Sequence, residues 1–249
     1  MSVMFTCSID DGHPSDMKMA DLLNRHDLAG TFFIPIKNRE GPPVLSAAKI
    51  REMGARFEIG SHTYDHCFLN SVDSKQARFQ IEEGKRKLED IIGKPVAGFC
   101  YPGGKYQREH IGLVKSAGFQ YARTTMNLCF SSGRNRFEMP TTCQFYPHDR
   151  SVYCRNFIKS GCWPQRYDGL ALTLIEANWL KRIYALFDHA CEHGAVFHLW
   201  GHSNDVDKLG AWEELDRFLA YVASRTAAPG RVDNMQLARI FYPHTGSSA

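Results

Sequence analysis

The sequence carries little net charge. Its 30 lysine and arginine residues stand against 27 aspartate and glutamate residues, which leaves a formal charge of +3 at pH 7. A protein that binds the phosphates of a nucleic acid, or an anionic membrane surface, concentrates far more positive charge than this. We therefore expect no nucleic-acid partner.

Long apolar segments and paired cysteines are also missing. No stretch is apolar enough over the length that a membrane span requires, and the first residues lead into a short apolar run without the basic region of a signal peptide. The eight cysteines form no CxxC pair, a pattern typical of reduced and partly buried thiols. We expect a cytoplasmic protein with neither a membrane span nor a structural zinc site, and its oligomeric state stays open.

No internal repeat, low-complexity tract or linker divides the 249 residues, so we expect one α/β domain over residues 1–249. Short runs rich in β-branched and aromatic residues predict strands. Amphipathic stretches between them predict helices, the first two capped by Ser15 and Ser74. The predicted strands cover 3–9, 30–36, 56–59, 96–101, 119–124 and 195–200, and the predicted helices cover 16–26, 75–92, 109–117, 172–193 and 212–224.

This alternation predicts a parallel sheet with crossover helices, either open or closed into a barrel. Only residues 126–167 break the rhythm. Because long irregular segments in compact domains are usually functional, we expect an irregular insertion there that carries substrate contacts.

Two fragments carry most of the chemistry: SIDDG, which contains Asp10 and Asp11, and HTYDH, which begins at His62 and ends at His66. Imidazoles four positions apart share one face of a helical turn, and a carboxylate from a strand end can complete a three-ligand metal site with an open position. The second aspartate is then free to act as a general base toward water. Because strand ends meet at one rim of such a fold, we also expect His202, after the last strand, at this site.

Each fragment also has a simpler interpretation. Adjacent aspartates are common in loops, and a lone HxxxH usually lies on a helix surface; it is their joint occurrence at strand ends that favours a metal site. A second HxxxH, formed by His189 and His193, has no strand-end carboxylate beside it and is interpreted as exposed helix. His198 fits a buried, hydrogen-bonded imidazole, and His13 fits a loop residue or a substrate contact equally well.

With these motifs in order, the chain resembles the polysaccharide deacetylase, or NodB-type, domain of carbohydrate esterase family 4. The resemblance implies a distorted, incomplete (β/α) barrel with one divalent metal. It also implies Asp10 as base, His202 as acid and the backbone N–H of Gly103 at the oxyanion. The implied metal ligands are Asp11, His62 and His66. Trp200, Arg123 and Tyr101 are the expected substrate-binding residues.

The chain departs from this family at one position. The third motif usually begins with an arginine that orients the catalytic aspartate, whereas Cys100 stands there in this sequence. A thiol cannot donate a fork of charged hydrogen bonds. We expect Arg123 to take over this role toward Asp10. The acidic residue that tunes His202 is either Asp149 or Asp205.

The expected function is metal-dependent hydrolysis of an N-acetyl, or other small N-acyl, group from an amino sugar. The substrate is a small sugar conjugate or an oligosaccharide. Zinc is the first choice of metal, although two imidazoles and a carboxylate also accept iron, cobalt or nickel. Two alternatives stay open: a catalytically lapsed sugar-binding domain, suggested by Cys100, and a metal hydrolase that acts on a non-sugar amide or on phosphate.

Overall fold

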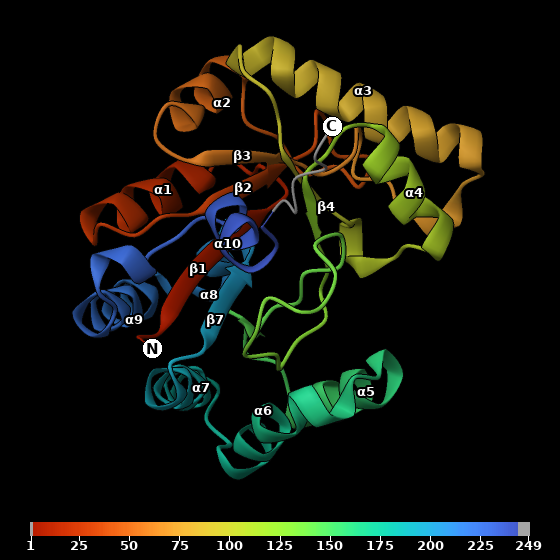
Figure 1. Ribbon diagram of the computed structural model, residues 1–249. Helices are drawn as coiled ribbons and strands as arrows, with labels where there is room; N and C mark the ends of the chain where they lie inside the picture. Colours follow the sequence, from red (N-terminus) through yellow and green to blue (C-terminus); the bar gives the residue numbers. More distant parts are fainter. Residues whose placement is uncertain (1, 244–249) are drawn as a thin grey trace.

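The computed structural model describes residues 2–243. Seven parallel strands form one curled sheet in the order β5-β4-β3-β2-β1-β7-β6, with helices around its outer face (Figure 1). The expected incomplete NodB-type (β/α) barrel is confirmed. The strands are β1 (Met4–Asp10), β2 (Thr31–Ile34), β3 (Glu58–Ser61), β4 (Gly98–Cys100), β5 (Tyr121–Arg123), β6 (Cys143–Gln144) and β7 (Val196–Gly201).

Ten α-helices accompany the strands in the described residues. They are α1 (Asp16–Arg25), α2 (Ala47–Gly54), α3 (Ser74–Ile92), α4 (Arg108–Ser116), α5 (Arg150–Ser160), α6 (Trp163–Ile175), α7 (Trp179–His193), α8 (Ser203–Leu209), α9 (Trp212–Arg225) and α10 (Asn234–Phe241). None of those described is long and apolar enough to cross a membrane.

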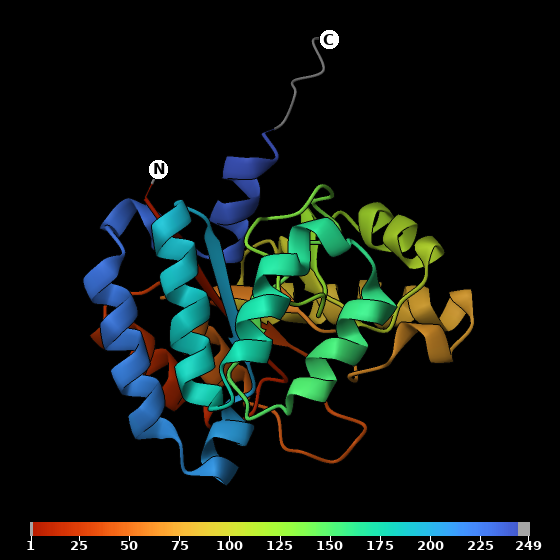
Figure 2. The same ribbon diagram turned by 90° about the horizontal axis from the view of Figure 1, so that it is seen from below.

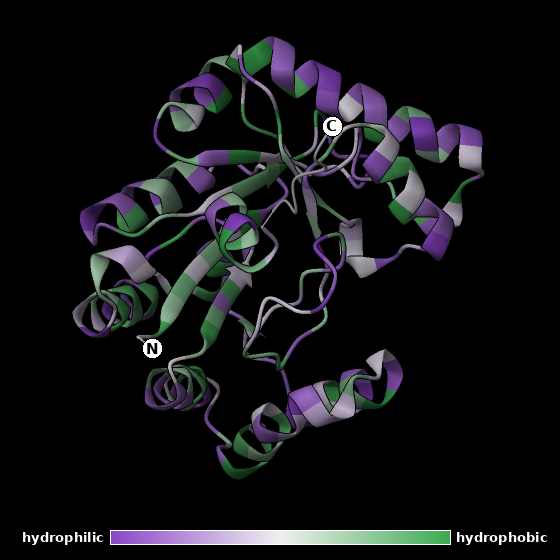
Figure 3. Ribbon diagram, viewed as in Figure 1, coloured by the Kyte–Doolittle hydropathy of each residue, from purple (hydrophilic) through white to green (hydrophobic). Residues whose placement is uncertain are grey.

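The core lies between the sheet and the helices. On one side, the rings of Phe5 and Phe197 in β1 and β7 pack with Phe187 of α7 and Phe218 of α9, with centroids 5.2 to 6.4 Å apart. Hydrophilic residues predominate along much of α3 (Figure 3). A helix that exposes a hydrophilic face and buries an apolar one leaves a periodic pattern in the sequence, which is why such helices could be predicted.

The barrel does not close by strand pairing, because β5 and β6 are the two edges of the sheet. An extended segment instead crosses the gap: Met139 exchanges backbone hydrogen bonds with Ala122 and Thr124, and the N–H of Thr142 donates to the carbonyl of His198. The outer edge of β5 therefore has a backbone partner, which limits unwanted pairing with other chains there.

The insertion is more ordered than expected. Residues 126–149 are largely irregular, but α5 and α6 form a helical pair beside α7 (Figure 2). Arg166 anchors this pair, because its buried guanidinium donates to the carbonyls of Asn127, Phe157 and Gly161. The predicted helix 172–193 is really two, broken where the Asn178 side chain accepts a hydrogen bond from the Lys181 N–H and starts α7.

Candidate metal and catalytic site

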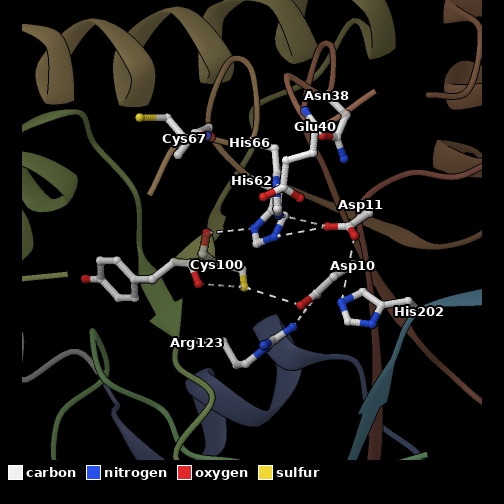
Figure 4. A network of polar contacts seen from close by, with 12 residues as sticks. Asp10, Asp11, Asn38, Glu40, His62, His66, Cys67, Cys100, Arg123 and His202 are labelled. Carbon is white, nitrogen blue, oxygen red and sulfur yellow. Dashed lines mark hydrogen bonds and ion pairs between the residues drawn. The ribbon is translucent and has the colours of Figure 1, made fainter. Parts of the chain in front are cut away.

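The strand ends bring a carboxylate and two imidazoles together. Asp11 follows β1, and His62 and His66 follow β3 (Figure 4). Oδ1 of Asp11 lies 3.5 Å from Nε2 of His62 and 3.2 Å from Nε2 of His66. The three ligand atoms all lie within 4.8 Å of one another, a spacing that suits donors around one ion. This is a candidate metal-binding triad.

The electrostatics of Asp11 and His62 match what a cation requires of its ligands. Burial lowers the pKa of His62 to about 4, so the ring is neutral at pH 7. Burial would raise the pKa of Asp11, but the imidazoles of His66, His62 and His202 around it hold it below its usual range. Burial would lower the pKa of His66, but Asp11 and Glu40 beside it raise that pKa above its usual value. Asp11 Oδ1 is buried without a hydrogen-bond partner among the described residues. An ionised carboxylate oxygen that faces two imidazole nitrogens fits a divalent cation.

The turn that carries the two histidines is not helical, contrary to expectation. Thr63 and His66 have φ values of +68° and +61°, and Asp11 has +77°. Such left-handed conformations are uncommon outside glycine, and especially so for a β-branched residue. The Thr63 hydroxyl accepts the N–H of Cys67 at 2.9 Å, which stabilises the turn. The imidazoles thus converge through a strained turn, a feature that clusters at functional sites.

Asp10 is held by the arginine expected for it. Arg123 donates from Nη2 to Oδ1 of Asp10, and both side chains are buried. Cys100 Sγ lies 3.8 Å from the other carboxylate oxygen. Cys100 and Arg123 are paired residues of β4 and β5, so the guanidinium reaches Asp10 from the neighbouring strand. The rings of Phe33 and Trp200 flank it, with centroids 5.2 and 5.1 Å away.

His202 lies on the other side of the carboxylates. Its Nδ1 is 2.9 Å from Oδ2 of Asp205, and its Nε2 is 3.8 Å from Oδ2 of Asp11. Burial would lower the pKa of His202, but the hydrogen bond with Asp205 and the nearby carboxylates raise it to about 9. The ring therefore carries a proton at pH 7. Of the two acidic candidates, Asp205 is the partner, whereas Asp149 caps α5.

The other expected site residues lie at different depths. Gly103 is exposed in a left-handed conformation, with φ at +59°, just after β4. Trp200 is half-buried, and its ring centroid lies 5.6 Å from that of His202. Tyr101 is fully buried, and its hydroxyl donates to the carbonyl of Phe137. Tyr101 and Arg123, which are also expected to bind substrate, both have fully buried side chains.

The structure adds residues that sequence reasoning missed. Ser203 donates to the buried carboxyl of Asp16, and its hydroxyl also lies 2.8 Å from that of Ser15. This explains why Ser15 does not cap α1 as predicted. Burial raises the pKa of Asp16 well above its usual value. The network ties the start of α1 to the residue after His202. In the sequence, Asp16 is visible only as an acidic residue in the first turn of a predicted helix.

A second missed group lies between β6 and α5. Nε2 of Gln144 is 3.4 Å from Nδ1 of His202, and Oε1 of Gln144 is 2.7 Å from Nε2 of His148. Gln144 ends a strand of two residues, which is too short to leave a periodic pattern in the sequence. His13, by contrast, lies 2.7 Å from the Ser15 hydroxyl, and His198 is buried, 2.9 Å from the Ser8 hydroxyl.

Fold and site together define an α/β barrel protein with a candidate metal centre at its strand ends. The polysaccharide deacetylase family model matches residues 3–122. This match covers just under half of the chain and confirms the resemblance drawn from its motifs. The match includes the triad, but it ends before Arg123 and His202.

Two curated relatives match part of this chain, and one solved structure shares its fold. A chitooligosaccharide deacetylase of Azorhizobium caulinodans is 28% identical over 117 residues, which are 45% of this chain and 54% of that protein. A peptidoglycan-N-acetylglucosamine deacetylase of Bacillus cereus is 27% identical over 103 residues, 41% of this chain and 46% of that protein. The chain thus spans about half the length of these curated relatives. The solved structure of PuuE allantoinase shares the fold, with a TM-score of 0.66 and 16% identity over 98% of this chain and 92% of that one.

Proposed function

We propose that this protein is a metal-dependent hydrolase that removes an N-acetyl, or another small N-acyl, group from an amino sugar. One observation carries the proposal: the Asp10 carboxylate, paired with Arg123, and the protonated His202 imidazole lie on either side of the metal-binding triad. The two curated deacetylases act on amino sugars according to their names, and this supports an oligosaccharide or a small sugar conjugate as substrate.

A divalent cation bound by the triad would acidify water and stabilise the negative charge that develops on the acyl oxygen. Zinc suits this donor set, as do iron, cobalt and nickel. Because Asp11 is ionised and His62 is neutral, the triad presents the protonation states that a cation needs without a prior proton loss from these two groups.

The chain's own groups divide the proton transfers. Arg123 donates to Oδ1 of Asp10. Only the weak thiol donor of Cys100 lies near Oδ2, at 3.8 Å, so Oδ2 is the oxygen that takes a proton from the attacking water. His202 gives its Nε2 proton to the departing nitrogen, since an amine leaves far more readily than an amide anion. Asp205 accepts from Nδ1 of the same ring and keeps it in that orientation. The exposed Gly103 N–H is the proposed backbone donor to the oxyanion.

The lapsed sugar-binding alternative explains the site less well. A binding domain needs neither a buried carboxylate with its own guanidinium nor an imidazole with its own carboxylate, yet both pairs are present. All eight cysteines are free, and we infer a reducing compartment such as the cytoplasm, where small sugar conjugates are accessible.

The test is release of acetate and a free amine from N-acetylglucosamine oligomers and from N-acetylated sugar conjugates. The protein is first stripped with a chelator and then supplied with Zn²⁺ or Co²⁺. We expect activity only after metal is restored. Equal activity in the stripped protein would refute metal dependence, and metal binding without hydrolysis of any N-acyl sugar would refute the proposed reaction.

A further inference from the structure

Each imidazole at the site has an outer nitrogen that faces away from the neighbouring carboxylate of Asp11. For His62 this nitrogen, Nδ1, lies 2.9 Å from the carbonyl oxygen of Cys100. For His202 it lies 2.9 Å from Asp205. For His66, Nδ1 is buried and makes no hydrogen bond within the described residues. The acceptor that faces it is the carboxylate of Glu40, with Oε2 3.4 Å away.

Glu40 comes from the loop between β2 and α2, and this loop is fixed to the histidine turn. The N–H groups of Ile36 and Lys37 both donate to the carbonyl of Tyr64, at 2.9 and 3.1 Å. The Arg39 N–H donates to the carbonyl of Asp65, and its guanidinium donates twice to the Asp65 carboxylate, at 3.1 and 2.7 Å. Tyr64 and Asp65, which lie between the two histidines of HTYDH, thus bind the segment that carries Glu40.

The loop also orients Glu40 itself. The Asn38 side chain accepts the Glu40 N–H at 2.9 Å, and the Gly41 N–H donates to the Asn38 carbonyl at 3.2 Å in a tight turn where Gly41 has φ at +101°. Figure 4 shows Asn38 and Glu40 beside His66. The Glu40 side chain is half-exposed, so one side of its carboxylate faces solvent while the other side faces the ring.

We propose that Glu40 is a positioning residue whose carboxylate accepts the Nδ1 proton of His66 and so holds Nε2 toward Asp11. This inference rests on the proposed function of the triad as a cation site. Histidine ligands commonly donate their second ring N–H to a carboxylate, which fixes the tautomer and makes the ligand more basic. The same arrangement explains the role of Asp65. Its ion pair with Arg39 fixes the loop and so keeps the Glu40 carboxylate close to the His66 ring.

The experiment measures the affinity of the stripped full-length protein for Zn²⁺ by competition with a chromogenic chelator. We expect Glu40→Ala to bind about 10- to 100-fold more weakly, the usual effect of losing such a partner. Glu40→Gln keeps an acceptor oxygen and should recover most of the affinity. The matched control is Glu52→Ala, since Glu52 is 50% exposed with one ion pair to Lys49, compared with 52% for Glu40.

Two results would overturn the proposal. Wild-type affinity in Glu40→Ala shows that the carboxylate does not position His66, even if KM for the sugar rises, because Glu40 would then be a substrate contact. A wild-type protein that binds no Zn²⁺ overturns the cation site itself, and the inference with it. The two failures are distinguishable, because only the second one appears in the unmutated chain. Thermal unfolding of each stripped variant shows whether it is folded.

Discussion

Removing the charge of Arg123 provides the sharpest test of the site's electrostatics. The guanidinium is fully buried, pairs with the buried carboxylate of Asp10, and lies between the rings of Phe33 and Trp200. Arg123→Met keeps an unbranched apolar chain between the rings but leaves the carboxylate uncompensated. Breaking one side of a buried ion pair costs about 3–5 kcal/mol, a large part of the roughly 5–15 kcal/mol that stabilises a typical domain.

The assay is urea unfolding in the presence of a chelator, so that loss of a bound cation does not contribute. Asp10→Asn should also destabilise, because it leaves the guanidinium without its counter-charge. The double variant Asp10→Asn/Arg123→Met should then lose much less than the sum of the two singles. Additivity within about 0.5 kcal/mol would refute the pairing, since that is the behaviour of independent sites.

The same pair allows a test of catalysis. Arg123→Ala should lower kcat, because Asp10 loses its fixed orientation. Adding Cys100→Arg should restore part of the rate, since paired residues on adjacent strands are only about 5 Å apart and the space left by Arg123 accommodates the new side chain. An unchanged rate in Arg123→Ala would exclude the orienting role.

Three further predictions concern the triad and the acid. His66→Ala should abolish Zn²⁺ binding in a folded protein, and full occupancy measured by metal analysis would exclude this site. Asp10→Asn should retain metal while kcat falls at least about 100-fold, the size of a general-base effect; metal loss would mean that the aspartates have exchanged roles. Asp205→Asn should lower the His202 pKa from about 9 in an NMR titration of stripped protein.

The sign of the His202 effect on stability follows from linkage. Its folded pKa, about 9, lies above the usual value of 6.5. The folded state of the stripped protein therefore gains stability that is complete below about pH 6.5 and is lost as the pH rises through 9. Asp205→Asn should reduce this gain. A variant whose stability keeps the wild-type dependence between pH 6 and pH 9 would show that Asp205 is not the group that raises the pKa.

The positions of most strands could be predicted because the residue composition that favours a strand is contained within the strand itself. Apolar runs such as 3–9 and 195–200 are short and rich in β-branched and aromatic residues, which favours a strand over a helix, and they form β1 and β7. The two residues of β6 left no such pattern. The cap of α3 is Asp73 and not the predicted Ser74. Both residue types can accept a hydrogen bond from a helix N-terminus, so the sequence alone does not show which of two neighbours takes the capping position.

The candidate ligands could be predicted for a related reason. Asp11 follows the end of one predicted strand, and His62 and His66 follow the end of another. The carboxyl ends of parallel strands lie at one rim, so the topology alone brings the three residues together. Glu40 and the Asp16–Ser203 contact could not be predicted, since they depend on how a loop folds back and how two helix starts meet. Arg123 could be predicted because Cys100 leaves Asp10 without the usual arginine, but the complete burial of Arg123 depends on the packing of the folded chain.

The pairing of Cys100 with Arg123 has a consequence for how relatives of this chain are classified. A search that requires an arginine at the first position of the third motif would discard this protein as inactive. Yet a guanidinium reaches the same carboxylate from the residue directly opposite on the next strand. Genomic surveys of deacetylase-like sequences would therefore separate working enzymes from decayed copies more accurately if they scored the two facing positions as one, and counted a chain as defective only when both lack the charge.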